Sequence, residues 1–295
     1  MNSIFSRDWS PSVASRLDAV LAATAEHPSP LAAFDFDNTL VRGDIGECFL
    51  ACMARTGNLR DPAHGVLSLL AEGPRRELTA LWEEGSPLLC GCLMRAYRDL
   101  ESRDPAAAYT MAAAAVSGFY PEELPPLLET CLSYATLLPH APAKAPIGDD
   151  FFSFFDTFRP MPPTVELARI LAEAGARLVV VSASFAPLVR AACARVLPVA
   201  PEAVLGVELV TDREGRYLPR ARHPLTLGVG KTEALNEAFP RDRHTLVLAV
   251  GDSAGDAPLL KAALHGLFLR HRVTDAALCG DLARDGVIVA SLPPA

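Results

Sequence analysis

Two aspartates separated by one residue follow a short apolar stretch near the N-terminus. Asp35 and Asp37 come directly after residues 31–34, and Thr39 completes an Asp-x-Asp-x-Thr pentamer. One carboxylate can attack phosphorus as a nucleophile, while a second can donate a proton to the leaving oxygen. The pentamer is ambiguous by itself, because aspartate and asparagine also cap turns and the starts of helices.

Further polar groups stand at comparable places later in the chain. Each one ends an apolar stretch or begins a helical pattern. The groups are Ser182 with Ser184, Lys231, and Asp252 with Ser253 and Asp256. In open α/β sheets, ligands bind beyond the carboxyl ends of the strands. We therefore expect these groups to meet the first two aspartates at one edge of one sheet.

Together these residue types supply what phosphoryl transfer requires, namely an in-line nucleophile, charge neutralisation and a proton for the leaving group. We predict Asp35 as the nucleophile, through an aspartyl-phosphate, and Asp37 as the general acid and base. The Ser182 hydroxyl and the Lys231 ammonium would bind the phosphoryl oxygens and complete the catalytic set. Oxygen ligands gathered at one point suit Mg²⁺, a hard cation, so we expect a magnesium cofactor.

The elements that must position these groups alternate between apolar strands and amphipathic helices. The predicted strands are residues 31–34, 177–182, 245–250, 266–269 and 287–290. The helical patterns are residues 13–23, 163–174, 187–196, 231–239, 258–263 and 274–284. This alternation predicts an α/β fold with a Rossmann-like, doubly wound parallel sheet. Residues 204–210 and 216–218 flank a glycine-containing turn and predict a β-hairpin.

Residues 45–160 interrupt the alternation. They contain only helical patterns, at residues 45–55, 66–72, 87–100, 105–116 and 122–132. Residues 138–148 are rich in proline and alanine and are expected to form a linker, while the phenylalanine-rich run 151–155 is expected to pack against the core. The predicted organisation is a catalytic core of residues 1–44 and 161–295 with an all-helical insertion of residues 45–160.

Composition argues against several classes of protein. The chain has 295 residues, 50% of them hydrophobic, and a net charge of −8 without a long basic run, which disfavours nucleic acid or an anionic membrane as a partner. No apolar stretch reaches the length needed to span a bilayer. The first ten residues lack the apolar region of a signal peptide. The seven cysteines are odd in number and scattered, so we expect buried free thiols and a cytoplasmic protein.

The motifs resemble those of the haloacid dehalogenase-like phosphatase superfamily, in the same order. The matching residues are Asp35, Asp37 and Thr39, then Ser182, then Lys231, then Asp252 and Asp256. The resemblance implies that Mg²⁺ is held by Asp35, the backbone carbonyl of Asp37, and Asp252. It also implies that Asp256 positions Lys231, and that the helical insertion is a cap domain that closes over small substrates.

Within this superfamily, the chain looks closest to phosphoserine, phosphocholine and phosphoethanolamine phosphatases, which implies a small, amine-bearing phosphomonoester as substrate. Asp44 falls where phosphoserine phosphatases carry an acidic residue that faces the substrate amine. The alternative for Asp44 is an acid at a helix N-terminus, stabilised by the helix dipole. The predicted substrate-binding residues are Asp44, Ser182, Ser184 and Lys231.

Two motifs depart from the phosphoserine phosphatase pattern. Ser182-Ala183-Ser184 stands where the usual sequence is Ser-Gly-Gly, and the asparagine expected one residue before Asp256 is missing. Ser253 is the candidate to replace that asparagine at the phosphate. The aromatic residues of the insertion are either a wall for a quaternary amine or core residues. They are Trp82, Tyr97, Tyr109, Phe119 and Tyr120.

Two other functions stay open at this point. One is a phosphotransferase or mutase on the same scaffold, and the other is a non-catalytic protein that binds a phosphorylated ligand. Asp37 favours hydrolysis, because an acid and base at this place can activate water. The expected partner is a small phosphomonoester, with no nucleic acid and no membrane, and a homodimer is an open alternative to a monomer.

Overall fold

The computed structural model describes residues 3–137, 159–198, 200–270 and 276–291. At its centre is a six-stranded sheet in the order β10-β9-β8-β1-β4-β5, with parallel pairing throughout. The strands are β1 (Pro30–Phe34), β4 (Arg177–Phe185), β5 (Ala203–Val207), β8 (Thr245–Gly251), β9 (His265–Arg270) and β10 (Ile288–Ser291). The chain runs outward from β1 through β4 to β5, and then returns to β8 on the other side of β1. The predicted doubly wound parallel sheet is confirmed.

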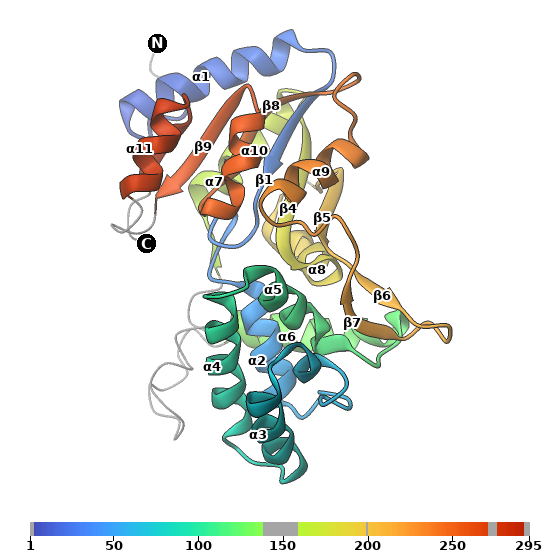
Figure 1. The fold of residues 1–295 in the computed structure, drawn as a ribbon. Coiled ribbons are helices and arrows are strands. Elements are labelled where there is room, and N and C mark those ends of the chain that lie inside the picture. The colour runs from blue at the N-terminus through green and yellow to red at the C-terminus, as the bar shows by residue number, and fades with distance from the viewer. Residues whose placement is uncertain (1–2, 138–158, 199, 271–275, 292–295) are drawn as a thin grey trace.

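Helices cover both faces of this sheet (Figure 1). They are α1 (Pro11–Glu26), α7 (Pro162–Glu173), α8 (Ala186–Val196), α9 (Val229–Ala238), α10 (Ala257–Ala262) and α11 (Ala276–Arg284). Leu31 and Ala33 of β1 pack into a cluster with α9, α10 and α11, whereas Ala32 and Phe34 pack into a cluster with α1, α7 and α8. Because successive side chains of a strand point to opposite faces, a strand covered on both sides must be apolar throughout.

Five α-helices occupy the described part of the predicted insertion. They are α2 (Ile45–Arg55), α3 (Glu72–Glu83), α4 (Leu89–Glu101), α5 (Pro105–Ala113) and α6 (Leu124–Leu137). In Figure 1 they gather beyond the carboxyl ends of the strands, and α5 contacts both β4 and β5. The predicted helix at residues 66–72 is wrong, because Val66–Leu69 forms a short 3-10 helix and α3 begins at Glu72. Helix α3 was not predicted, because Leu78 is its only fully buried residue.

The chain enters and leaves the helical segment at adjacent points. Strand β2 (Val41–Arg42) pairs antiparallel with β3 (Arg159–Pro160), and the Met161 amide donates to the Leu40 carbonyl at 2.8 Å. Such a pairing gives a compact double connection between the core and the insertion. The linker predicted at residues 138–148 and the run 151–155 lie outside the described residues, so the domain boundaries stay a prediction.

The hairpin prediction was wrong in its first half. Residues 203–207 form β5 of the main sheet, and the hairpin consists of β6 (Leu209–Thr211) and β7 (Tyr217–Ala221). The hairpin also bonds to the helical segment, since the Gly118 amide donates to the Tyr217 carbonyl and the Tyr217 amide donates to the Phe119 carbonyl, both at 2.9 Å. A single residue, Glu208, separates the two strands, so the point where the chain leaves the main sheet was missed.

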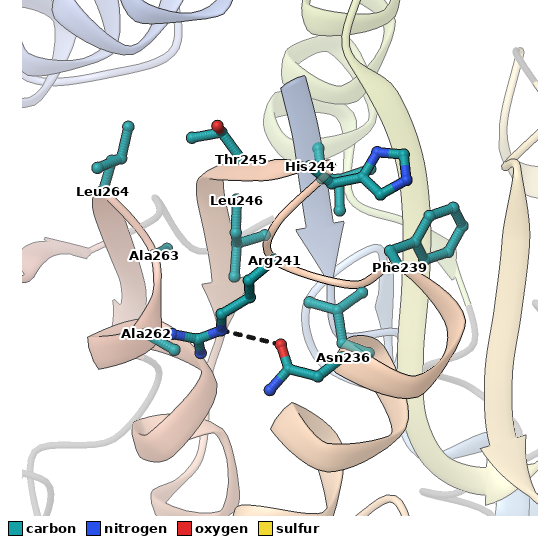
Figure 2. A pocket seen from close by; sticks show the side chains of 11 residues that line it. Asn236, Phe239, Arg241, His244, Thr245, Leu246, Ala262, Ala263 and Leu264 are labelled. Atoms are coloured by element: carbon teal, nitrogen blue, oxygen red, sulfur yellow. Dashed lines mark hydrogen bonds between the residues drawn. The ribbon is translucent and has the colours of Figure 1, made fainter. Parts of the chain in front are cut away.

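A cavity of about 240 Å³ lies at the amino edge of the sheet, where β1 and β8 begin. Figure 2 shows Arg241, whose Nε donates to Asn236 Oδ1 at 2.9 Å, and the imidazole of His244. His244 Nδ1 lies 2.7 Å from Ser29 Oγ. None of the described residues lining this cavity carries a carboxylate, so it lacks the oxygen ligands expected of the catalytic site.

The cysteines are all free thiols, and six of them are buried while Cys92 is half-buried. The expectation of free thiols is therefore confirmed, and burial holds for all but Cys92. Within the described ranges, no helix combines the length and the apolar character that crossing a membrane requires.

Candidate active site

The predicted site residues meet at the carboxyl edge of three adjacent strands. Asp35 follows the last residue of β1, and Asp252 follows the last residue of β8. Ser182 and Ser184 lie near the carboxyl end of β4. Because β1 lies between β4 and β8 in the sheet, these groups converge although more than two hundred residues separate the first from the last. The helical segment faces this edge (Figure 1).

Lys231 joins two of the aspartates in a buried ion-paired group, which we call the lysine cluster: Asp35, Lys231 and Asp256. Lys231 lies in the first turn of α9, and its Nζ is 2.7 Å from Asp35 Oδ1 and 2.5 Å from Asp256 Oδ1. The three residues are only 5%, 3% and 0% exposed, respectively. Thr39 Oγ1 lies 3.4 Å from the other oxygen of Asp35.

The second oxygen of Asp256 organises the loop after β8. It accepts hydrogen bonds from the Ser253 hydroxyl at 2.7 Å, the Ser253 amide at 3.0 Å and the Asp252 amide at 3.2 Å. Gly251 is required there, because a Cβ at this position would lie 2.5 Å from Asp256 Cβ. The Ser253 hydroxyl is thus bonded to Asp256, and its predicted contact with phosphate stays a prediction.

Asp37 belongs to a different group, which we call the serine cluster: Asp37, Ser184 and the backbone amide of Ile45. Asp37 Oδ1 accepts from the Ile45 amide at 2.7 Å, and Oδ2 accepts from the Ser184 hydroxyl at 2.7 Å. The Ser182 hydroxyl is farther from Oδ2, at 3.5 Å. Ser184, predicted to bind substrate, therefore points toward the predicted acid and base.

Asp44 caps the first helix of the insertion. It is the N-cap residue of α2, and its Oδ1 accepts a hydrogen bond from the Glu47 amide at 2.8 Å. This contact confirms that Asp44 stands at a helix N-terminus. A role of this carboxylate toward a substrate amine stays a prediction.

Burial and neighbouring charges set the protonation of the lysine cluster. Burial raises the pKa of Asp35 to about 7, although the attraction of Lys231 opposes the shift. Burial also acts to lower the pKa of Lys231, but the charges of Asp256 and Asp35 outweigh it and the net pKa is raised. Lys231 therefore carries its positive charge at neutral pH.

The remaining carboxylates are less compensated. Burial, followed by the charges of Asp44 and Asp35, raises the pKa of Asp37 well above its usual value. Burial, followed by the charges of Asp35 and Asp256, likewise raises the pKa of Asp252. An edge with this many carboxylates and one lysine favours the binding of a cation.

Three carboxylates could hold a metal ion. Asp35, Asp252 and Asp256 each offer an oxygen, and these oxygens lie within 4.8 Å of one another. An all-oxygen set of this kind fits Mg²⁺, which favours hard oxygen ligands and retains several waters. Both oxygens of Asp256 already accept hydrogen bonds, one from Lys231 and the other from the Ser253 hydroxyl and two amides, which favours Asp35 and Asp252 as the metal ligands. The side chain of Asp37 faces the serine cluster, and metal binding through its backbone carbonyl stays a prediction.

The sequence profile of haloacid dehalogenase-like hydrolases matches residues 32–261. This range is most of the chain and includes every predicted site residue. The chain belongs to the haloacid dehalogenase-like hydrolase family. No curated protein matches the sequence.

Two solved structures share the fold of this hydrolase over most of its chain. One is a conserved functionally unknown protein from Anaerococcus prevotii DSM 20548, with a TM-score of 0.70 and 18% identity over 98% of this chain and 96% of that one. The other is a protein with unknown function from Bordetella pertussis Tohama I, with a TM-score of 0.59 and 18% identity over 89% of this chain and 98% of that one. These likenesses concern the fold alone.

Three contributors to the site of this hydrolase were not predicted from the sequence. They are the Ile45 amide, Gly46, and Thr226, whose hydroxyl donates to the Ser182 carbonyl at 2.6 Å. A signal did exist for the contact of Ser184 with Asp37. Ser184 lies two residues after Ser182 in one strand, so the two side chains are expected on the same face of the sheet.

Proposed function

We propose that this haloacid dehalogenase-like hydrolase is a Mg²⁺-dependent phosphomonoesterase that works through an aspartyl-phosphate. The observation that carries the proposal is the contact of Lys231 Nζ with Asp35 at 2.7 Å, beside the carboxylate of Asp252. A buried carboxylate next to a fixed ammonium and a carboxylate-rich cation site is the arrangement that in-line attack on phosphorus requires.

In the first half of the reaction, an oxygen of Asp35 forms a bond to phosphorus while the bond from phosphorus to the leaving oxygen breaks. Asp37 gives its proton to that leaving oxygen, so the alcohol departs neutral. The Lys231 ammonium and the Ser182 hydroxyl stabilise the charge that develops on the phosphoryl oxygens. When bound, Mg²⁺ would supply further neutralisation of that charge, held by Asp35 and Asp252.

In the second half, Asp37 acts as the base. It takes a proton from a water molecule, the water oxygen bonds to phosphorus, and the bond from phosphorus to Asp35 breaks. Inorganic phosphate is released and both carboxyl groups return to their starting states. The same residue serves as acid and base because the two half-reactions mirror each other.

An amine-bearing substrate is the finer part of the proposal. Burial and then the charge of Asp44 raise the pKa of both Tyr97 and Tyr109, as expected where aromatic side chains lie near an acid. Tyr97 is fully buried in the core, so the partly buried Tyr109 is the aromatic candidate for contact with the substrate. Carboxylate and aromatic surfaces together attract an ammonium group, which supports a substrate such as phosphoserine, phosphocholine or phosphoethanolamine.

The main experiment is a hydrolysis assay on purified protein. We expect p-nitrophenyl phosphate to be hydrolysed with Mg²⁺ present and EDTA to stop the reaction, with added Mg²⁺ restoring it. A panel of phosphorylated metabolites then ranks phosphoserine, phosphocholine and phosphoethanolamine against sugar phosphates. Absence of Mg²⁺-dependent phosphate release from every compound would overturn the proposal.

Asp44→Asn tests the amine separately. Asparagine still caps a helix, so the substitution removes the charge and keeps the hydrogen bond to the Glu47 amide. We expect kcat/KM for the best amine-bearing substrate to fall by about ten-fold, a typical effect of one charge contact, while p-nitrophenyl phosphate is unaffected. Equal losses on both substrates would reject Asp44 as the ammonium partner.

The remaining expectations stay predictions. We propose that residues 45–160 form a cap over a core of residues 1–44 and 161–295, and that the free thiols reflect a cytoplasmic protein. A small phosphomonoester is the proposed partner, without nucleic acid or membrane, and sedimentation would distinguish a homodimer from a monomer.

A further inference from the structure

The carboxyl group of Asp37 is held by neutral donors. One oxygen accepts from the Ile45 amide at 2.7 Å, and the other accepts from the Ser184 hydroxyl at 2.7 Å. Lys231, the cation of the site, pairs instead with Asp35 and Asp256. The direction of the Asp37 carboxyl group therefore depends on hydrogen bonds from the serine cluster.

Ser184 is rigidly placed to make its hydrogen bond. It is 3% exposed, and its amide donates to the Ser182 hydroxyl at 3.0 Å. The next residue of β4, Phe185, stacks on Phe49 of α2 with ring centroids 6.5 Å apart. The end of β4 is thus fixed against the first helix of the insertion, and the hydroxyl is buried between them.

Gly46 makes room for this hydroxyl. A Cβ at Gly46 would lie 3.0 Å from Ser184 Oγ and 3.3 Å from Asp44 Oδ1, closer than ordinary van der Waals contact. The absence of a side chain at residue 46 therefore lets the first turn of α2 approach Ser184 without crowding its hydroxyl. This close approach also brings the Ile45 amide to Asp37.

We propose that Ser184 is a positioning residue for the proton transfer of Asp37. The inference rests on the proposed function, in which Asp37 protonates the leaving oxygen. During that step the proton moves from Asp37 to the leaving oxygen, while Ser184 keeps its own proton and holds the carboxyl group in line. Ser184 touches no reacting atom, and it acts through Asp37.

The test compares Ser184→Ala with the wild type on two aryl phosphates of similar shape. Phenol is about as weak an acid as tyrosine, with a pKa of about 10, so phenyl phosphate needs a proton on its leaving oxygen. p-Nitrophenol is a much stronger acid and leaves without that help. We expect Ser184→Ala to lower kcat/KM for phenyl phosphate about ten-fold more than kcat/KM for p-nitrophenyl phosphate, a fraction of what general acid catalysis supplies.

Ser117→Ala is the matched control. Ser117 is a serine of similar burial, 5% exposed, and its hydroxyl lacks a hydrogen-bond partner among the described residues. The control should leave the ratio of the two kcat/KM values unchanged, and Ser184→Thr, which keeps the hydroxyl, should restore part of the ratio. Circular dichroism on each variant excludes a loss of fold as the cause.

The outcomes separate this inference from the proposed function. Equal losses on both substrates in Ser184→Ala, or no loss on either, would overturn the positioning role while the phosphatase stands. A wild-type protein that hydrolyses neither ester with Mg²⁺ would overturn both. A selective loss on phenyl phosphate that the Ser117→Ala control lacks would support the positioning role.

Discussion

The two aspartates of the first motif lie two residues apart and yet belong to differently built surroundings. Asp35 is part of the lysine cluster, where an ammonium at 2.7 Å compensates its charge. Asp37 is part of the serine cluster, where an amide and a hydroxyl hold it. Burial raises the pKa of both carboxyl groups. The pKa of Asp35 rises to about 7 although Lys231 opposes the shift. The pKa of Asp37 rises well above its usual value, and no cation is among the groups that oppose this rise.

This difference matches two chemical roles. A nucleophile must be ionised, and an ion pair favours the charged form. A general acid must keep its proton near neutral pH, and a buried site with neutral donors and nearby negative charge favours the protonated form. Under the proposed function, the comparison therefore indicates that two identical side chains would receive different tasks from the residues that surround them.

The largest effect is expected from breaking the lysine cluster at its nucleophile. Asp35→Asn should lower kcat on every substrate by at least about 10⁴-fold, because an amide cannot attack phosphorus. The fold should persist, since the side chain keeps its shape and loses one buried charge. Steady-state kinetics and circular dichroism check both statements. A residual rate within about a hundred-fold of the wild type would contradict the role of Asp35.

The next largest effect is on stability, which should fall more when the lysine cluster is disrupted than when the serine cluster is. Lys231→Met leaves the carboxylates of Asp35 and Asp256 buried without their cation, so we expect the unfolding free energy to fall by about 3–5 kcal/mol. Ser184→Ala removes one neutral hydrogen bond and should cost about 1 kcal/mol. Urea unfolding of the metal-free proteins measures both values. Equal losses would show that the clusters do not differ in the way described.

A second substitution gives the control for Lys231→Met. Adding Asp35→Asn removes one of the two carboxylates left unpaired, so the double variant should recover part of the lost stability. If the two losses simply add, the ion pair is not the origin of the destabilisation.

The pH dependence of stability should report the raised pKa values directly. The pKa of Asp35 is 3.8 when unperturbed and about 7 when folded, so between these pH values the folded protein binds more protons than the unfolded chain. The unfolding free energy of EDTA-treated protein should therefore fall as pH rises through this window. Differential scanning calorimetry should show a lower Tm at about pH 7.5 than at about pH 5.5.

Two additions test this experiment. Asp35→Asn and Asp37→Asn should each flatten part of the fall of Tm with pH, because each removes a carboxyl group whose pKa is raised in the folded protein. Mg²⁺ should raise the Tm more at the higher pH, because its carboxylate ligands must lose their protons to bind it. A metal-free Tm that rises with pH through this window would contradict the direction of both shifts.

The lysine cluster was predictable from the sequence, whereas the serine cluster was only partly so. Asp35 and Lys231 stand at a strand end and a helix start, and the topology of parallel sheets brings such positions together. The Ile45 amide is a backbone group, so the type of residue at this position does not predict its contact. That contact with Asp37 depends on how α2 docks on the core. Ser184 was identified as a site residue, but its partner was not.

The fold likewise has parts that could be predicted from the sequence and parts that could not. Strands that are apolar on both faces, such as β1, were found because burial on both sides demands continuous apolar sequence. Helix α3 was missed because its first half is polar and its large apolar residues, Leu78, Leu81 and Trp82, all lie in its second half. The first half of the hairpin was misassigned because only Glu208 separates β5 from β6, and pairing with β4 distinguishes the two strands.

The smallest expected effect tests whether the serine cluster depends on the close approach of α2. Gly46→Ala places a methyl group 3.0 Å from Ser184 Oγ, so kcat/KM for phenyl phosphate should fall by about three-fold, less than one tenfold step of 1.4 kcal/mol. The matched control is Gly73→Ala, since Gly73 is likewise the second residue of a helix and has nothing within 4 Å of its Cβ position. In the Ser184→Ala background the hydroxyl is gone and Gly46→Ala should cost less, giving a coupling energy of at least about 0.5 kcal/mol. Additive losses in this cycle would mean that Gly46 and Ser184 act independently, and that the serine cluster does not depend on the missing side chain at residue 46.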